Sequence, residues 1–356
     1  MRNNTNPNQI SLFDSVEDRG VVERKSGGRN ASAIHIHNNI ISIENLLSAW
    51  REFLRRKRKR KDIELFSLNL MDNILSLNRE LVNKTYRHGP YRAFKINDPK
   101  PRDIHKASVR DRLLHHAIYR ILYPFFDPKF IFDSYSCRRA KGTHRAINRF
   151  RKYIYKVSQN HSRTAWILKC DIRKFFANID HVILLDILKQ QSVDADTVLL
   201  LSEVVGSFQT KDRPGVGLPL GNLTSQLLVN IYMNEFDQFM KRELKIKYYI
   251  RYADDFVILS ENKSYLEKLL PNTANFLDKK LKLQLHPDKM FIKTIVSGVD
   301  FLGWVHFPHS RVPRTSTKNR MFRNLKKKQS KATVASYVGL LNHGNTYRLQ
   351  QRIKGK

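Results

Sequence analysis

The sequence contains very little cysteine, since only Cys137 and Cys170 occur among its 356 residues. Two thiols are too few for a disulfide framework, a zinc knuckle or any metal site built from thiolates. Such scarcity is typical of proteins in a reducing compartment. We therefore expect a cytoplasmic protein that holds no thiolate-bound metal.

Long apolar runs are also missing. Nowhere do apolar residues continue for the ~18 or more positions that a membrane span requires. The first residues, MRNNTNPNQISLFDSVED, lack the apolar stretch of a secretory signal. This pattern predicts a protein that is neither secreted nor embedded in a membrane. Internal repeats and inter-domain linkers are not apparent, and 41% hydrophobic content suits one large multilobed domain or two ordinary ones.

Acidic residues are scarce beside basic ones, at 32 against 65, which leaves a formal net charge of +33. This excess goes far beyond what solubility requires and indicates a polyanionic partner. Nucleic acid fits best, because the cations are spread along the chain among 14 tyrosines and 20 phenylalanines that can stack on bases. A solvated basic surface, as in some ribosome-associated proteins, explains the charge equally well. Composition alone therefore does not indicate catalysis.

The N-terminal part combines a polar segment with a helical one. Residues 1–43 are rich in Asn, Ser, Gly and charge, which predicts a flexible arm. Helical spacing of apolar side chains begins near Ser42 and leads into seven consecutive basic residues, Arg55 to Lys61. The basic run is either a solvated helix end or a direct phosphate contact, and its pattern favours neither.

Helices and short strands alternate through the rest of the chain, which predicts a mixed α/β protein. A helix from Leu65 to Leu81 precedes strand-like pieces broken by prolines, and VRDRLLHHAIYRILYPFF then predicts another helix. The apolar strand AWILKCDI contains Asp171 near its end. After two further helices, the turn RPGVGLPLGN opens another helix, and KYYIRYADDFVILS predicts a hairpin. The segment from about Pro308 is strongly basic and partly helical.

Three aspartates carry the clearest chemistry. Asp254 and Asp255 lie at the turn of the predicted hairpin, where adjacent like charges are costly unless a cation or solvent relieves them. An isolated pair at a turn is most often only solvated. Asp171 changes this interpretation, because it ends another apolar strand and joins the pair if the strands are neighbours. Three carboxylates suit Mg²⁺, and two such ions would activate a primer 3′-hydroxyl and stabilise the leaving pyrophosphate.

The motifs around these aspartates resemble those of the reverse transcriptases. DIRKFF and YADDF look like motifs A and C of that family, and LPLGNLTSQ between them resembles motif B. RAFKINDPKPRDIHKASVRDR and SYSCRRAKGTHRA look like fingers motifs, LKLQLHPDK like motif D and FLGW like motif E, so the similarity covers roughly residues 44–350. The resemblance implies an RNA-directed DNA polymerase with a right-hand α/β (α+β) fold. Its parts would be fingers at 44–165, a palm with an antiparallel sheet at 166–305 and a small helical thumb at 306–356.

The resemblance also implies a metal site and a nucleotide site. Asp171, Asp254 and Asp255 would be the catalytic residues and, with Ile172, would hold two Mg²⁺ ions, for which Mn²⁺ can substitute. Cations of the fingers would bind the triphosphate, and a bulky gate would exclude a ribose 2′-hydroxyl. A motif D lysine would protonate pyrophosphate. The implied nucleotide-binding residues are Lys100, Arg102, Phe176, Leu220, Gly221, Gln226 and Lys289.

A third set of residues would contact primer and template. Without the resemblance, Phe176 is a core phenylalanine and Lys289 a surface lysine, while Gly303 is a turn glycine. The cations near the C-terminus would then form only a solvated charged face. With the resemblance, Phe175 remains the core candidate of the phenylalanine pair. The implied primer- and template-binding residues are Tyr252, Gly303, Trp304, Arg320, Arg323, Lys326 and Lys327.

Motif B departs from the commonest family pattern, in which glutamine precedes the glycine and Ser-Pro ends the motif. Here Leu220 precedes Gly221, and Ser225 is followed by Gln226. This variant resembles the enzymes of diversity-generating retroelements, which copy a template RNA and misincorporate at its adenines. Loss of an amide at Leu220 would loosen geometric selection of the nascent pair. The implied partners are template RNA, the RNA/DNA hybrid, dNTPs and a small basic accessory protein.

Three other functions fit some of these features. A retron-like or phage-defence reverse transcriptase shares the chemistry and differs in biology. A relative of the group II intron proteins is a second alternative, although the segment after Trp304 is too short for an RNase H or endonuclease domain. A degenerate polymerase that only binds or scaffolds RNA is the third. The intact carboxylates, gate and Gly221 argue against such decay.

Overall fold

The structure is a computed structural model that describes residues 36–97, 101–327 and 330–355. Most of the predicted N-terminal arm, residues 1–35, and the predicted triphosphate ligand Lys100 lie outside this range. The described residues form two compact units, each assembled from three segments of the chain. Unit 1 contains the described part of Met1–Phe132 with Arg173–Phe239 and Phe276–Gln284, and unit 2 contains Asp133–Ile172, Met240–Asn275 and the described part of Leu285–Lys356.

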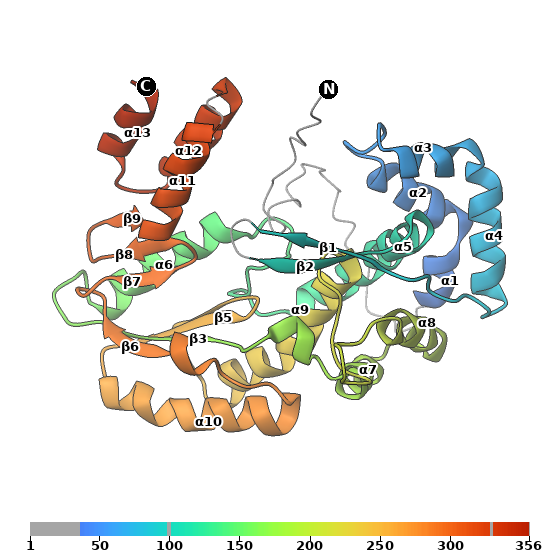
Figure 1. The fold of residues 1–356 in the computed structure, drawn as a ribbon. Coiled ribbons are helices and arrows are strands. Elements are labelled where there is room, and N and C mark those ends of the chain that lie inside the picture. Colours follow the sequence, from blue (N-terminus) through green and yellow to red (C-terminus); the bar gives the residue numbers. More distant parts are fainter. Residues whose placement is uncertain (1–35, 98–100, 328–329, 356) are drawn as a thin grey trace, which may run out of the picture. The chain divides into compact units, whose positions relative to one another are not determined.

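Unit 1 is mainly helical (Figure 1). Side-chain oxygens cap the N-termini of several of its helices: Ser108 accepts from Asp111 N, and Asp194 accepts from Thr197 N. Two antiparallel strands form a separate ribbon. The elements are α1 Ile36–Ile41, α2 Ile43–Phe53, α3 Lys61–Leu68, α4 Leu70–Val82, β1 Arg92–Ile96, β2 Arg102–Lys106, α5 Val109–Phe126, η1 Asp127–Lys129, η2 Phe175–Asn178, α7 His181–Gln190, α8 Ala195–Gly206 and α9 Leu223–Gln238.

Two predictions for the N-terminal part were wrong. Residues 36–41, assigned to the flexible arm, form α1, because Ile36 and Ile40 are buried and Asn45 and Asn78 donate to the carbonyls that end this helix. So short a helix leaves too little periodicity to detect in the sequence. The helix predicted from Leu65 to Leu81 is two helices, α3 and α4, because Asn69 between them leaves helical geometry.

Unit 2 is built on a four-stranded antiparallel sheet in the order β4-β5-β3-β6. Ile167, Val257 and Ile250 lie on one face of this sheet and join an apolar core with Phe150 and Phe301. The last part of α10 belongs to unit 1. The elements are α6 Thr143–Val157, β3 Trp166–Asp171, η3 Phe239–Glu243, β4 Tyr249–Tyr252, β5 Asp255–Ser260, α10 Lys263–Leu281, η4 Pro287–Lys289, β6 Phe291–Thr294, β7 Val299–Phe301, β8 Trp304–His306, β9 Arg311–Pro313, α11 Thr315–Lys327, α12 Lys331–Leu341 and α13 Tyr347–Lys354.

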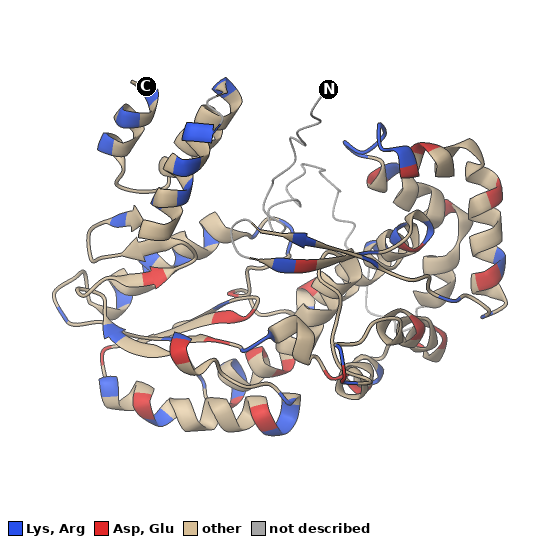
Figure 2. Ribbon diagram, viewed as in Figure 1, with Lys and Arg blue, Asp and Glu red and all other residues tan. Residues whose placement is uncertain are grey.

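The C-terminal helices of unit 2 carry a small core and many cations. Met321, Leu341 and Ile353 are buried together, one from each of α11, α12 and α13. Figure 2 shows lysine and arginine along these helices and again on the turn between α2 and α3, which carries most of the basic run Arg55 to Lys61. In the described residues, no helix is both long and apolar enough to cross a membrane.

The compact units do not follow the predicted boundaries of fingers, palm and thumb. Residues 173–239, which we placed in the palm, group with the helices of the fingers, because α9 packs against α5. The division into 44–165, 166–305 and 306–356 stays a prediction. By contrast, the predicted hairpin is confirmed as β4 and β5, and the helix VRDRLLHHAIYRILYPFF is confirmed as α5.

Candidate active site

The sheet of unit 2 brings the three aspartates together. Asp171 ends β3, Asp255 begins β5, and the two are direct partners in the antiparallel register. Residues paired in this way project from the same face of a sheet. Asp254 lies in the two-residue turn between β4 and β5, and its carbonyl accepts a hydrogen bond from Ile172 N at 3.1 Å. Residues from distant parts of the sequence therefore lie together at one end of the sheet.

The turn that carries Asp254 has a strained backbone conformation and is hydrogen-bonded by a buried arginine. Ala253 has a φ of 54°, a left-handed conformation that costs energy for a residue with a Cβ. The fully buried guanidinium of Arg251 donates to the Ala253 carbonyl at 3.2 Å and to Ser134 Oγ at 3.1 Å. Backbone hydrogen bonds between Arg251 and both Asp133 and Tyr135 tie the strand to that segment. The geometry of the turn thus depends on a buried cation.

The carboxylates repel one another in a poorly solvated place. Burial, with the nearby charges of Asp255 and Asp171, raises the pKa of Asp254 to about 7. Burial also raises the pKa of Asp255, against the opposing effect of the Lys169 ammonium. Within the described residues, Asp255 Oδ1 is buried and accepts no hydrogen bond. Negative charge is therefore concentrated here beyond what the neighbouring protein groups satisfy.

Two lysines form ion pairs with aspartates of this cluster. Lys289 Nζ, on η4, lies 2.9 Å from Asp171 Oδ1, and His286 N donates to the Asp171 carbonyl at 2.7 Å, which fastens this segment to the end of β3. Lys169, two residues before Asp171, makes an ion pair with Asp255 Oδ1 at 3.5 Å. Sequence reasoning named Lys289 and missed Lys169.

The donor set fits a divalent cation. Among the described residues, no three His, Cys, Asp or Glu side chains are grouped closely enough to hold a metal ion. However, the unsatisfied oxygen of Asp255 and the raised pKa values of Asp254 and Asp255 show that added positive charge would be favourable. Carboxylate oxygens are the ligands that Mg²⁺ prefers. Asp171, Asp254 and Asp255 would supply them, and Ile172, the fourth predicted ligand, is buried beside them.

The predicted nucleotide-binding residues that the structure describes, apart from Lys289, lie in unit 1. The motif B turn is docked on β2, since His105 N donates to the Leu220 carbonyl at 3.1 Å and Asn222 Nδ2 donates to the His105 carbonyl at 3.0 Å. Gly221 has a φ of 104°, and a Cβ there would lie 2.9 Å from Ile104 Cγ2, so only glycine fits. Arg102 begins the same strand. Leu220, Gly221 and Arg102 thus come from adjoining segments.

The other members of that set lie on helical elements of unit 1. Phe176 is partly buried on η2, and its carbonyl accepts from Leu218 N at 2.8 Å, whereas Phe175 is buried. The prediction that Phe175 is the core member of the pair is confirmed. Gln226 lies in the first turns of α9 and is partly exposed.

The predicted primer and template residues divide into buried and exposed ones. Tyr252 is buried on β4, with its hydroxyl accepting from Thr143 Oγ1 at 3.0 Å. Leu302 and Gly303 both have positive φ in the two-residue turn between β7 and β8, as a type I′ hairpin requires. Trp304 packs in the core of unit 2, so its indole has no free face for nucleic acid. On α11, Arg323, Lys326 and Lys327 are exposed and Arg320 is partly exposed.

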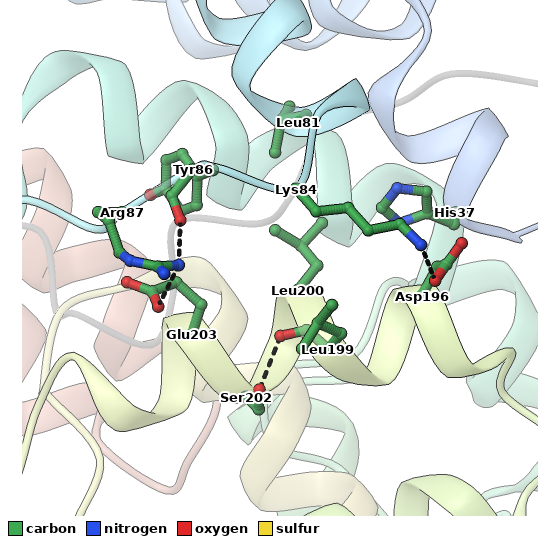
Figure 3. Close-up of a pocket in the computed structure, with 10 residues that line it drawn as sticks. All are labelled: His37, Leu81, Lys84, Tyr86, Arg87, Asp196, Leu199, Leu200, Ser202 and Glu203. Atoms are coloured by element: carbon green, nitrogen blue, oxygen red, sulfur yellow. Dashed lines mark hydrogen bonds and ion pairs between the residues drawn. The ribbon is translucent and has the colours of Figure 1, made fainter.

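A pocket in unit 1 offers a different environment (Figure 3). It is lined by residues of α1, the end of α4, the segment after α4 and α8, and contains none of the predicted site residues. Lys84 pairs with Asp196 at 2.6 Å, and Arg87 pairs with Glu203 at 3.4 Å. Both acidic side chains of the pocket are therefore ion-paired, and neither carboxylate is left to attract a cationic ligand.

Comparison with known proteins decides the family. The model of the family described as reverse transcriptase (RNA-dependent DNA polymerase) matches residues 95–306, which is more than half of the chain. This chain belongs to the reverse transcriptase family. Membership confirms the predicted class of enzyme, an RNA-directed DNA polymerase, and the predicted right-hand fold with its antiparallel sheet.

This reverse transcriptase is similar to several curated proteins. It is 27% identical over 268 residues to Protein YkfC of Escherichia coli (strain K12), covering 64% of this chain and 69% of that protein. It is 23% identical over 319 residues to the Group II intron-encoded protein LtrA of Lactococcus lactis subsp. cremoris, covering 70% and 51%. With the Putative COX1/OXI3 intron 2 protein of Saccharomyces cerevisiae it shares 20% identity over 401 residues, covering 94% and 45%. The chain thus spans about half the length of the last two relatives.

Among solved structures, the reverse transcriptase is similar to telomerase from Candida albicans in complex with a fragment of telomeric RNA. The TM-score is 0.48 at 11% sequence identity, covering 65% of this chain and 46% of that one.

Sequence reasoning missed two charged residues of the reverse transcriptase's carboxylate site. Lys169 and Arg251 each interrupt an otherwise apolar strand, AWILKCDI and YYIRYADD. A charge in the middle of a buried strand is costly without a partner, and that was the available signal. The partners themselves depend on strand register, which local pattern does not specify.

Proposed function

We propose that this reverse transcriptase adds deoxynucleotides to a primer under the direction of an RNA template. The observation that carries the proposal is the meeting of Asp171 and Asp255 in register, with Asp254 beside them. Two Mg²⁺ ions, or Mn²⁺ in their place, supply the Lewis-acid chemistry of the reaction when bound. The protein's own contribution is to concentrate carboxylates where the ions and the triphosphate meet.

Other side chains have supporting roles in this proposal. Lys289 stands 2.9 Å from Asp171, where its ammonium serves as a proton donor to the departing pyrophosphate. Arg102 and Lys100 bind the triphosphate, and Phe176 excludes the 2′-hydroxyl of a ribonucleotide. Gly221 is the glycine of a motif B turn that two hydrogen bonds hold against β2, the strand that carries Arg102.

The remaining predicted residues would hold the nucleic acid. Tyr252 and the backbone at Gly303 and Trp304 would face the primer, while Gln226 would contact the nascent pair. The thumb would grip the backbone of the hybrid through charge, which makes binding weaken as salt rises. Its contacts would come from Arg320, Arg323, Lys326 and Lys327.

Primer extension on a poly-rA template with Mg²⁺ tests the proposal. Wild-type protein extends an oligo-dT primer, and Asp254→Ala abolishes extension while leaving binding of the RNA/DNA hybrid intact. A protein that binds the hybrid and extends no primer with either metal would instead be the RNA-binding scaffold.

We further propose that the enzyme belongs to a diversity-generating retroelement and misincorporates at template adenines. Leu220 supports this proposal, since a leucine replaces the amide that would otherwise hydrogen-bond near the nascent pair. Leu220→Gln is then expected to lower adenine errors several-fold, measured by sequencing cDNA made from one RNA template. Leu199→Gln, which changes an exposed leucine of α8, is the matched control. Unchanged adenine errors in Leu220→Gln would count against this assignment.

Its relatives favour a second candidate, a reverse transcriptase derived from group II introns. LtrA and the yeast intron protein both align over most of this chain. The two candidates differ in template and partner, since the retroelement enzyme would use a structured template RNA and a small basic accessory protein. Sequencing the RNA that copurifies from cells distinguishes intron RNA from a retroelement template.

A further inference from the structure

Lys169 occupies an apolar position on the central sheet. In the antiparallel register, the residues directly opposite are Val257 on β5 and Phe291 on β6. Val257 and Ile167, two residues before Lys169, belong to the buried core on the same face. The Lys169 side chain is only 12% exposed. Burying an ammonium among such neighbours is costly unless a charged group compensates it.

Asp255 is the ion-pair partner of this lysine. Lys169 Nζ lies 3.5 Å from Asp255 Oδ1, the oxygen that is buried and accepts no hydrogen bond within the described residues. Asp171, two residues further along β3, lies directly opposite Asp255, so Lys169 reaches this carboxylate diagonally across the sheet. Both residues of the pair are anchored in regular strands.

Lys289 is more exposed and less constrained than Lys169. Its side chain is 43% exposed, and it belongs to the three-residue η4 rather than to the sheet. It can move away from Asp171 at little cost, because solvent is available to its ammonium. Lys169 has no such route, since leaving Asp255 would place its charge against Val257 and Phe291.

We propose that Lys169 is a positioning residue that holds the Asp255 carboxylate through its ammonium and competes with the incoming divalent cation for that carboxylate. The inference rests on the proposed function, in which the three aspartates bind metal. The built-in cation keeps Asp255 oriented and lets Asp171 and Asp254 lead in binding the ions. It also makes the metal-free cluster less attractive to divalent cations than three aspartates alone would be.

Direct binding of Mn²⁺ to the full chain, without nucleotide or nucleic acid, tests this inference. Free Mn²⁺ is measured by electron paramagnetic resonance during titration. Lys169→Met keeps most of the side-chain volume and removes the charge, so it is expected to bind Mn²⁺ about tenfold more tightly. Lys169→Arg keeps the charge and is expected to remain near the wild type. Lys282→Met, which breaks the ion pair with Asp180, is the control and leaves the affinity unchanged.

A second readout separates positioning from charge alone. At saturating Mn²⁺, Lys169→Met is expected to extend primers about tenfold to a hundredfold more slowly, because nothing then holds Asp255 in place. Lys169→Arg restores most of that rate. A role confined to folding would lower the melting temperature and leave the affinity for Mn²⁺ untouched.

Unchanged or weaker Mn²⁺ binding by Lys169→Met overturns the inference, as does tighter binding by Lys169→Arg. If Lys169→Met does not fold, Mn²⁺ affinity is measured instead for Lys169→Gln, which also lacks the charge and is expected to bind more tightly, and for Lys169→Arg, which is expected to match the wild type. The proposed function fails separately, when the wild type binds Mn²⁺ and the RNA/DNA hybrid but extends no primer.

Discussion

The carboxylate end of β3 and β5 and the pocket on α1 and α8 contain the same kinds of side chain and balance them differently. In the pocket, Lys84 neutralises Asp196 and Arg87 neutralises Glu203, at a partly exposed surface. At the sheet end, three aspartates are crowded with an unsatisfied oxygen, and the pKa of Asp254 is raised to about 7. At the proposed site the three poorly solvated carboxylates outnumber the two ammonium groups beside them, Lys169 and Lys289, whereas in the pocket each carboxylate has a cationic partner.

The largest expected effect is at the three aspartates of the sheet end. Asp171→Asn should lower the rate of primer extension by about a thousandfold, because losing one of the proposed metal ligands would remove several kcal/mol of charge stabilisation in the transition state. Asp196→Asn in the pocket removes an equally charged group and should leave the rate unchanged. Single-turnover extension measures both, and equal losses in the two variants would erase the distinction between the regions.

The next effect concerns the buried cation beneath the turn. Arg251→Leu removes charged hydrogen bonds to Ala253 and Ser134, which should lower the free energy of unfolding by about 3 kcal/mol and slow extension. Arg87→Leu, on the pocket, removes a guanidinium that is 76% exposed and should change neither. Thermal melting and extension are compared for the two variants; an unaffected Arg251→Leu would show that the turn keeps its shape unaided.

Protonation of the buried His115 should affect the stability of the fold and leave metal binding unchanged. His115 is buried, with Thr224 and His88 as ring partners, and burial lowers its pKa to about 3. Because its folded pKa lies below the unfolded value of 6.5, its contribution is present above pH 6.5 and is lost as pH falls toward 3. A pKa difference of 1 between the folded and unfolded states corresponds to about 1.4 kcal/mol of folding free energy.

Urea unfolding between pH 7 and pH 5 checks this dependence. Stability should fall more steeply with acid in the wild type than in His115→Asn, which has no imidazole to protonate. Mn²⁺ affinity at constant pH should be the same in both proteins. Parallel acid profiles would show that His115 does not contribute to acid sensitivity.

The smallest effect should come from the pocket's own ion pair. Lys84→Met separates no buried charge, because the lysine and Asp196 are both about half exposed, so the melting temperature should barely change. The same substitution at Lys169 is expected to change Mn²⁺ affinity. Differential scanning calorimetry of Lys84→Met measures the melting temperature, and a large decrease would show that this ion pair is important for the stability of the fold.

Much of the fold followed from local patterns. Helix α5 was predicted because its apolar positions repeat at helical spacing, and the structure adds the cap at Ser108. The β4-β5 hairpin was predicted because two apolar strands flank a short polar turn. The prediction was wrong at α1, where Ile36 and Ile40 are buried by tertiary packing that a six-residue helix does not announce.

The sequence by itself determined the reverse transcriptase motifs, their order and the aspartates at the ends of apolar strands, because these depend on residue type and short spacing. Only the tertiary structure decided that Asp171 faces Asp255, that Lys169 reaches across to the same carboxylate, and that Arg251 supports the turn at Ala253. The physical reason is register. Pairing between strands distant in sequence is selected by the packing of the whole sheet, and a shift of one residue would send each of these side chains to the opposite face.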